Sequence, residues 1–254
     1  MTLPKTPSFR LDGRRALVAG ASSGIGLGAA VALAEAGAHV TLAARGADKL
    51  NAVADEMRAA GFRVDTLVMD VADVVATQAQ IEAEAPFDVL VNSAGLARHT
   101  PATQTTFDDY NTVTDLNVRG AYFLTRAVAS GLLAAQKPGS LINISSQMGH
   151  VGGVDRGVYC ATKHAVEGFT KAMAIEWGRA GIRVNTLCPT FIRTPLGEQT
   201  LAIPERRAWI EGMIKLGRVG EIEDIMGAVV FLASDAASLV TGTSLLVDGG
   251  WTAD

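Results

Sequence analysis

Hydrophobic positions follow two alternating patterns along this chain. Short runs of valine, leucine, isoleucine and alanine are typical of buried strands, and longer segments with apolar residues three and four apart are typical of helices. We predict seven strands, at residues 15–20, 39–44, 63–70, 88–95, 140–145, 182–189 and 244–249. Between them, segments such as GIGLGAAVALAEAGA and HAVEGFTKAMAIEWGRAG have helical spacing and end at glycine, a common helix stop.

This alternation predicts an α/β protein with a doubly wound, Rossmann-type fold. Seven strands joined by helical crossovers form a parallel sheet with helices on both faces, because such crossovers are right-handed. We find no internal repeat, low-complexity tract or linker, so residues 1–254 are expected to form a single domain. Residues 190–220 break the alternation at Pro195 and Pro204, and we expect a lid over a site there; the alternative is a plain surface excursion.

Composition and charge limit the classes of binding partner that can be expected. The net charge is −4 and basic residues form no block, so neither nucleic acid nor an anionic membrane surface is expected as a partner. Two cysteines are too few for a disulfide framework, which fits a reducing cytoplasm. The first ten residues lack a signal-like apolar core and no later apolar run could span a bilayer, so we expect a cytoplasmic protein that acts on a small molecule.

The first candidate for chemistry is a glycine turn, VAGASSGIGLGAA, at residues 18–30. It follows a predicted strand and opens a predicted helix. Gly20, Gly24 and Gly26 would let the backbone approach a pyrophosphate at the helix N-terminus. A methyltransferase that binds an adenosyl cofactor could use a similar turn, and small residues can also serve helix packing, so this motif alone leaves the ligand open.

The second candidate is YCATK, at residues 159–163. Tyr159 and Lys163 lie four apart on a predicted helix and therefore on one face. A nearby cation favours the phenolate, so we expect Lys163 to lower the pKa of Tyr159 and make it a usable acid and base. The alternative is an ordinary solvated helix pair. Ser146 follows the strand at 140–145, at the sheet edge where ligands bind, so it can converge with Tyr159 on one atom.

These motifs occur in order with others along the whole chain. They are GASSGIG, Asp70 after the third strand, NSAG at 92–95, Asn117 in LNVRG, Ser146, YCATK, the proline turn CPTFIRT at 188–194 and the closing TGTSLLVDGG. In this combination the chain resembles the short-chain dehydrogenase/reductase family. Thr190 departs from it, because the family often has glycine after this proline, which affects the local backbone but leaves the catalytic set intact.

The resemblance implies roles for four catalytic residues. Tyr159 would exchange the proton and Ser146 would stabilise the substrate oxygen. Lys163 would act on Tyr159 and hold the nicotinamide ribose. Asn117 would support a water chain toward the lysine, or bond backbone at a helix kink.

The resemblance also implies a single dinucleotide-binding catalytic domain. The implied cofactor contacts are Gly20, Ser22, Ser23, Gly24, Ile25, Gly26, Arg45, Asp70, Val71, Asn92, Ala94, Gly95, Tyr159, Lys163, Pro189, Ile192 and Thr194. NAD-preferring proteins of this kind place an acidic residue after the second strand, whereas this chain has Ala44 and Arg45. A guanidinium suits a 2′-phosphate, so we predict NADP(H) over NAD(H), with NAD(H) still possible; the alternative is that Arg45 stacks on adenine or points into solvent.

The predicted function is hydride transfer between NADP(H) and a ketone or secondary alcohol, in an enzyme expected to be a homotetramer built on the helices at 106–135 and 158–180 and the C-terminal strand. The alternatives are a 3-oxoacyl thioester reductase and a non-catalytic nucleotide-binding sensor, although a sensor has no use for Ser146, Tyr159 and Lys163 together. We expect specificity to come from the loops after Gly149 and around Arg98 and from the lid.

The basic side chains of the lid favour an anionic substrate; they are Arg193, Arg206, Arg207, Lys215 and Arg218. No metal site is predicted, because the four histidines lack ligand spacing. We expect His150 to line the pocket wall and Cys160 to serve packing.

Overall fold

The computed structural model describes residues 2–253. All seven predicted strands form, and two of them, β2 (His39–Ala44) and β6 (Ile182–Pro189), have the predicted bounds. The fifth strand is shifted by one residue toward the N-terminus at unchanged length, and the other four are shorter, because the residues after them turn into loops. These five strands are β1 (Arg15–Ala19), β3 (Val64–Val68), β4 (Val89–Asn92), β5 (Gly139–Ile144) and β7 (Ser244–Val247).

Helices fill the connections between the strands. The longest is α6 (Gly157–Trp177), and a second long rod is built from α4 (Phe107–Thr114), the π-helical turn η2 (Asp115–Gly120) and α5 (Ala121–Ala134). The remaining α-helices are α1 (Gly24–Glu35), α2 (Ala47–Ala59), α3 (Val74–Glu82), α7 (Pro195–Leu201), α8 (Pro204–Met213) and α9 (Glu223–Ala233). Among residues 2–253, no helix combines the length and apolar character needed to cross a membrane.

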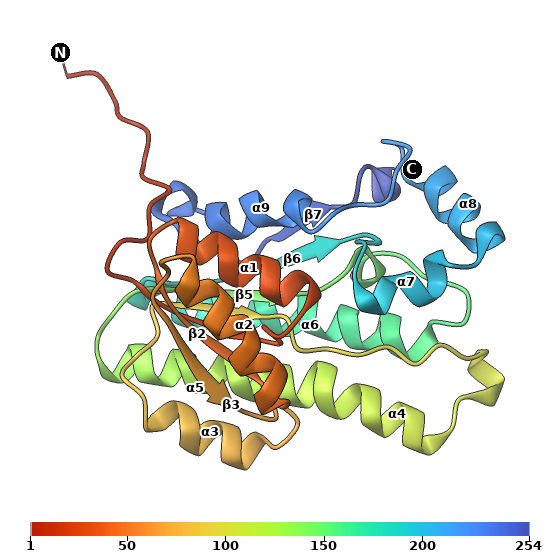
Figure 1. The fold of residues 1–254 in the computed structure, drawn as a ribbon, viewed down its shortest axis with the longest axis horizontal. Coiled ribbons are helices and arrows are strands. Elements are labelled where there is room, and N and C mark those ends of the chain that lie inside the picture. The colour runs from red at the N-terminus through yellow and green to blue at the C-terminus, as the bar shows by residue number, and fades with distance from the viewer. Residues whose placement is uncertain (1, 254) are drawn as a thin grey trace.

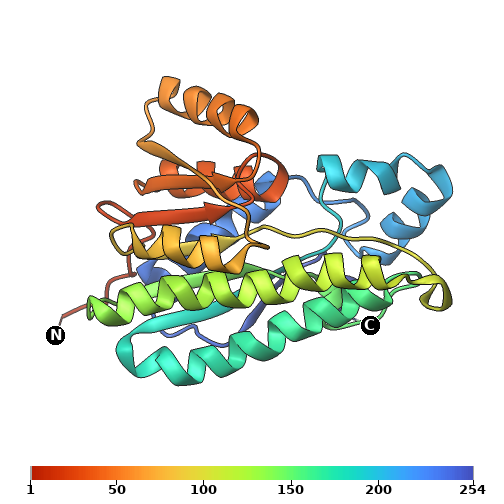
Figure 2. The ribbon, with the colours of Figure 1, turned by 90° about the horizontal axis from the view of Figure 1, so that it is seen from below.

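The sheet has the strand order β3-β2-β1-β4-β5-β6-β7, and every neighbouring pair is parallel. The chain builds one half outward from β1 to β3 and then returns to place β4 on the other side of β1. Helices α1, α2 and α9 lie on one face, and α3, α5 and α6 lie on the other (Figures 1 and 2). The prediction of a doubly wound parallel sheet is confirmed.

Alternation along the central strands supplies two cores. In β1, Ala16 and Val18 point into the core beneath α1 and α9, whereas Leu17 and Ala19 point into the core beneath α5 and α6. Strand β4 repeats this division. Because both faces of these strands are buried, they read in the sequence as continuous apolar runs.

The return of the chain opens a crevice at the carboxyl ends of β1 and β4, the place where doubly wound sheets bind ligands. Residues 190–220 leave the sheet above this edge and form α7 and α8 (Figure 1). The two ends of this excursion are joined, because Gly220 donates to the Phe191 carbonyl at 2.9 Å and accepts from the Arg193 amide at 2.8 Å. The segment therefore starts and ends at one narrow neck.

Candidate active site

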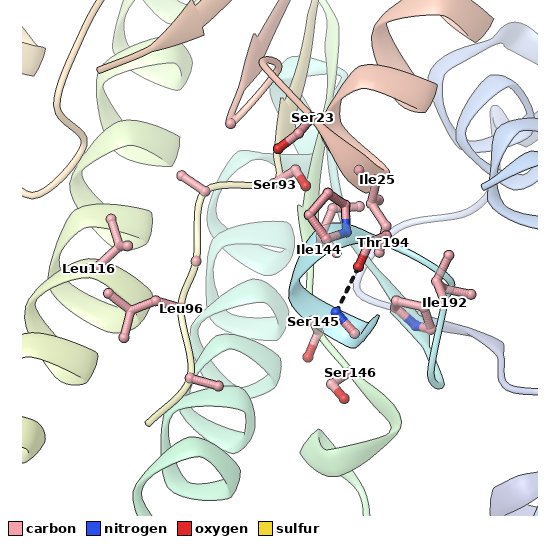
Figure 3. Close-up of a pocket in the computed structure, with 18 of the residues that line it drawn as sticks. Ser23, Ile25, Ser93, Leu96, Leu116, Ile144, Ser145, Ser146, Ile192 and Thr194 are labelled. Atoms are coloured by element: carbon pink, nitrogen blue, oxygen red, sulfur yellow. Dashed lines mark hydrogen bonds between the residues drawn. The ribbon is translucent and has the colours of Figure 1, made fainter. Parts of the chain in front are cut away.

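A cavity of about 860 Å³ lies over the carboxyl ends of the strands. Its lining runs from the glycine turn, past the loops after β2, β3 and β4, to the ends of β5 and β6 and the underside of α7. Figure 3 shows Ser23 and Ile25 at one end, Ser145 and Ser146 at the other, and Leu96 and Leu116 on the opposite wall. One continuous cleft thus joins the two motifs predicted to carry chemistry.

The glycine turn is packed too tightly for side chains. Gly20 has φ +77°, and a Cβ there would lie 2.9 Å from the backbone of Ser93 and Ala94. A Cβ on Gly26 would lie 2.2 Å from the Gly20 carbonyl oxygen, so Gly26 supports the turn from beneath and does not line the cavity. The turn leaves the N-terminus of α1 open toward the cleft, which suits a phosphate.

The loops after the next strands complete this half. Asp70 and Val71 follow β3 and line the cavity, as do Ala94 and Gly95 after β4. Asn92 instead lies buried below them, where it donates to Asn143 at 3.2 Å and accepts from the Ala94 amide at 3.3 Å. Asn92 therefore holds the loop that carries Ala94 and Gly95.

Arg45 comes directly after β2, is exposed and lines the cavity. Its neighbour Ala44 ends the strand, so this strand end offers no carboxylate. At the end of β6 and after it, Pro189, Ile192 and Thr194 line the cleft, and Thr194 lies beside the glycine turn at Gly24. The hydroxyl of Thr194 caps α7 by accepting from the Gly197 amide at 3.2 Å, the bond drawn in Figure 3.

Ser146 stands just beyond β5 and is buried. Its hydroxyl accepts from the Met148 amide at 3.1 Å and donates to the Gln147 side chain at 2.8 Å. The first bond fixes the oxygen by capping a short 3-10 helix, η3 (Gln147–Gly149). The second bond is to a side-chain amide, so the hydroxyl proton can be redirected to another acceptor.

Tyr159 and Lys163 meet in the first two turns of α6, as the spacing predicts. The Lys163 ammonium lies 5.6 Å from the centre of the Tyr159 ring and donates to the Ile144 carbonyl at 2.8 Å. Because Lys163 is buried, its pKa falls to about 8. This position, between strand end and tyrosine, makes the pair a part of the cleft and not a solvated surface pair.

The expected lowering of the Tyr159 pKa is wrong for this structure. Burial raises the pKa of Tyr159, and hydrogen bonding with Ser146 and the charge of Arg156 lower it by less. Desolvation disfavours charge on both groups, so it raises the pKa of the phenol and lowers that of the ammonium. The phenol therefore keeps its proton at neutral pH.

Asn117 lies buried inside the π-helical turn η2, outside the cavity lining. Its side-chain amide donates to the Leu96 carbonyl at 2.8 Å, and its side-chain oxygen accepts from the Leu96 amide at 3.0 Å. It also lies 3.3 Å from the Thr162 hydroxyl on α6. The backbone-bonding interpretation of Asn117 is thus present in the structure, and the water chain stays a prediction.

Some residues of the predicted specificity loops lie outside the cavity, although Ala97 and His99, on either side of Arg98, line it. Arg98 lies outside the lining and pairs with Asp108 and Asp109. His150 is exposed and does not line the cavity, which corrects our expectation. On the lid, surface ion pairs join Arg193 to Glu198 and Glu221, Arg207 to Glu211, and Arg218 to Asp224.

His99 and Arg156 are among the cavity residues that sequence reasoning missed. Arg156 precedes α6 by one residue and His99 follows the NSAG loop. Their closeness in sequence to Tyr159 and to NSAG was the available signal, since residues that flank such motifs tend to share their edge of the sheet.

The structure also gathers His150, Glu167 and Cys188, whose ligand atoms lie within 4.8 Å of one another. Glu167 is already bonded by the Thr186 hydroxyl at 2.8 Å, by Cys188 and by Ser244. Burial and the Glu167 charge raise the pKa of Cys188 to about 12, so the thiol keeps its proton and stays a poor metal ligand. The absence of a metal site stays a prediction.

Comparison with known proteins identifies the fold and the chemistry of its relatives. A family model described as enoyl-(acyl carrier protein) reductase matches residues 20–252. The chain is 39% identical over 245 residues to D-erythrulose reductase from Gallus gallus, covering 96% of this chain and 98% of that protein. It is 40% identical over 253 residues to D-threitol dehydrogenase from Mycolicibacterium smegmatis, covering 96% and 95%.

A solved structure agrees with these relatives. Gluconate 5-dehydrogenase from Burkholderia cenocepacia, in complex with NADP and tartrate, superposes with a TM-score of 0.94 at 37% identity and covers 97% of this chain and 98% of that one. The likeness therefore extends over nearly the whole fold.

Proposed function

Because this chain belongs to the short-chain dehydrogenase/reductase family, we propose that it transfers a hydride between NADP(H) and a carbonyl or secondary-alcohol carbon of a small polyhydroxylated substrate. It is an oxidoreductase, as are the dehydrogenases and reductases to which it is similar over nearly its whole length. The observation that carries the proposal is the single cleft in which the glycine turn, Ser146, Tyr159 and Lys163 meet.

The residues present fit a nicotinamide dinucleotide. A backbone cradle that admits no Cβ at Gly20 or Gly26 is suited to pyrophosphate oxygens. Arg45 would hold the 2′-phosphate, with Asp70 and Val71 near the adenine and Ile192 and Thr194 near the carboxamide. When bound, the nicotinamide ring supplies or accepts the hydride.

The side chains of the cleft would handle the proton. A protonated Tyr159 would donate to the oxygen of a carbonyl substrate, and its raised pKa keeps that proton available at neutral pH. Ser146 would turn its hydroxyl from Gln147 to the same oxygen and stabilise the developing negative charge. Lys163 uses one of its three N–H donors on Ile144, which leaves two for the cofactor ribose and a water.

The names of the relatives support a substrate class. D-Erythrulose, D-threitol and gluconate are the compounds in the names of the three relatives, and all are short, polyhydroxylated and open-chain in at least one form. We propose a ketose, polyol or sugar acid of this size. The cleft beyond the strand ends would take it beneath α7 and α8, so that residues 190–220 act as a lid that excludes water.

The assignment of Tyr159 is tested by Tyr159→Phe. We expect the specificity constant for reduction of a ketose such as erythrulose to fall by about a hundredfold to ten-thousandfold, because only the proton donor is lost. The dissociation constant for NADP(H), measured by fluorescence, should stay unchanged. Tyr110→Phe, on an exposed part of α4, is the matched control. Substantial turnover by Tyr159→Phe would disprove the mechanism.

Two further expectations belong to this proposal. We propose a homotetramer that uses the long helices and β7, and support comes from exposed apolar side chains such as Ile175 on α6 and Leu246 on β7. We also place the enzyme in the cytoplasm, a proposal that the two free thiols, Cys160 and Cys188, support.

A further inference from the structure

Arg156 occupies an unusual position for an arginine. It is the residue before α6, lies half-buried, and lines the same cavity as Ser146 and Tyr159. Its guanidinium lies over the ring of Phe191, 5.1 Å from the ring centre, and its Nη1 is 2.9 Å from Nε2 of His99. Stacking fixes the plane of the guanidinium and leaves its edges to form hydrogen bonds.

This guanidinium has no carboxylate partner within 4.0 Å among residues 2–253. The lid arginines Arg193, Arg207 and Arg218, by contrast, are all paired with carboxylates at the surface. Burial lowers the pKa of Arg156, because the cation has lost solvation, and the charge of the neighbouring Asp155 offsets only a small part of that loss. An anion bound in the cleft would compensate for the lost solvation of the guanidinium.

The surroundings add positive potential. Burial, Arg156 and Arg206 together lower the pKa of His99 to about 4, so His99 is neutral at physiological pH. The charge of Arg206 also lowers the pKa of Arg156, and the charge of Asp155 raises it by less. A neutral His99 bonded to Arg156 can orient the guanidinium without compensating its charge.

The position of this cation relative to the reacting end is defined by a chain of contacts. The ring of His99 meets the ring of Tyr159 edge to face, with centres 6.0 Å apart, and the same ring is hydrogen-bonded to Arg156. Phe191, beneath the guanidinium, stacks in turn on Trp251 at 5.8 Å. The cation is therefore held on the rings of Phe191 and Trp251, and its charge acts on Tyr159 at the reacting end.

We propose that Arg156, oriented by His99 and Phe191, binds a carboxylate of the substrate and selects short hydroxy or oxo acids over the corresponding neutral polyols. The planar fork of the guanidinium matches the two oxygens of a carboxylate. The inference rests on the proposed function, because the carboxylate belongs to the molecule that Ser146 and Tyr159 hold. The preference for anionic substrates is thereby assigned to Arg156 inside the cleft and no longer to the arginines of the lid.

The test compares tartrate with threitol, which share one carbon skeleton and differ in having carboxylates or hydroxymethyl groups at the ends. Dissociation constants are measured by calorimetry on the enzyme saturated with NADPH, the reduced cofactor, which cannot oxidise either alcohol, so no turnover occurs. We expect tartrate to bind the parent more tightly than threitol, and Arg156→Gln to weaken tartrate by about tenfold to a hundredfold, as for loss of a charge-assisted hydrogen bond. The affinity for threitol should change little in this variant.

Two variants serve as controls. Arg156→Lys should retain part of the tartrate affinity, because it keeps the charge but loses the fork. Arg207→Gln removes a surface arginine of the lid and should change neither ligand. The affinity for NADP, measured in each variant, reports whether the fold is intact.

Three results would overturn the inference. In Arg156→Gln, the affinities for tartrate and threitol could fall equally, or the affinity for tartrate could stay unchanged. In the parent, tartrate could bind no more tightly than threitol. The proposed function fails separately. If the parent binds tartrate through Arg156 but Tyr159→Phe keeps full turnover, the carboxylate site is supported and the catalytic role assigned to Tyr159 is disproved.

Discussion

Lys163 is a buried ammonium that donates to the Ile144 carbonyl, and its pKa is lowered to about 8. In the unfolded chain its pKa is near 10.5, so between these two values the unfolded state binds more protons than the folded state. Stability contributed by this residue therefore rises with pH through that window. Below about pH 8 the folded protein carries the full cost of a buried charge.

Comparison with Lys163→Met isolates this effect, since the variant lacks the titrating group. We expect the parent to gain roughly 2 kcal/mol of unfolding free energy relative to the variant between about pH 7.5 and 9.5. Urea unfolding of both proteins at the two pH values measures it. A difference that stays constant with pH, or that moves in favour of the variant, would mean that Lys163 is not desolvated.

Arg45 governs the choice of cofactor in the proposed function. A charge-assisted hydrogen bond contributes about 1.5 to 3 kcal/mol, so Arg45→Ala should reduce the preference for NADP(H) over NAD(H) by about tenfold to a hundredfold. Ala44→Asp should reduce it further by placing a carboxylate against the 2′-phosphate. Specificity constants for both cofactors measure the ratio. A parent that already prefers NAD(H) would contradict the assignment.

At the scale of elements, the glycine turn and α1 depend on a contact that admits no side chain. Gly26→Ala would place a Cβ 2.2 Å from the Gly20 carbonyl oxygen, so the turn must open. We expect weaker NADP binding and a loss of stability. In Gly227→Ala, on an exposed position of α9 with nothing within 4 Å, the same exchange should stabilise the fold by up to about 1 kcal/mol.

Thermal unfolding and NADP titration of the two glycine variants check this expectation. The pair separates the local cost of a Cβ from the general effect of alanine in a helix. Gly26→Ala binding NADP as tightly as the parent would show that the turn can relax, and the steric account of the cradle would fail.

The sequence predicted the elements well and their fine geometry less well. Strands such as β1 and β4 could be predicted because burial on both faces makes them nearly continuous apolar runs, while β3 ended earlier than predicted because Met69 and Asp70 turn into a loop. The π-helical turn around Asn117 could not be predicted, since one widened turn leaves no periodic signal. The direction of the Tyr159 pKa was missed because enclosure by distant segments decides it.

At the scale of the whole molecule, apolar side chains remain exposed on the long helices. Ile175 on α6 is 82% exposed and Tyr122 on α5 is 40% exposed. Figure 2 shows α5 and α6 running side by side along one flank of the molecule, where a second copy could cover both. Exposed apolar groups of this kind mark association surfaces when they are gathered on one face.

We therefore expect light scattering to report a tetramer at micromolar concentration. Ile175→Glu should shift the mass toward smaller species, because a buried, unpaired carboxylate would be costly at the interface. Val75→Glu, at an equally exposed position on α3, is the control. A stable monomer of the parent would refute the assembly, and equal effects of both variants would refute this choice of faces.

The number of residues in the widened turn at Asp115–Gly120 also determines the orientation of the cleft wall. Each residue of an α-helix advances the chain by about 100° around the axis, so removing one residue here would straighten the rod and rotate α4 by roughly that angle against α5. Arg98 would lose Asp108 and Asp109, and Leu96 would lose Asn117. Surface loops absorb insertions and deletions, but at this turn a change of one residue amounts to a rotation of the pocket wall.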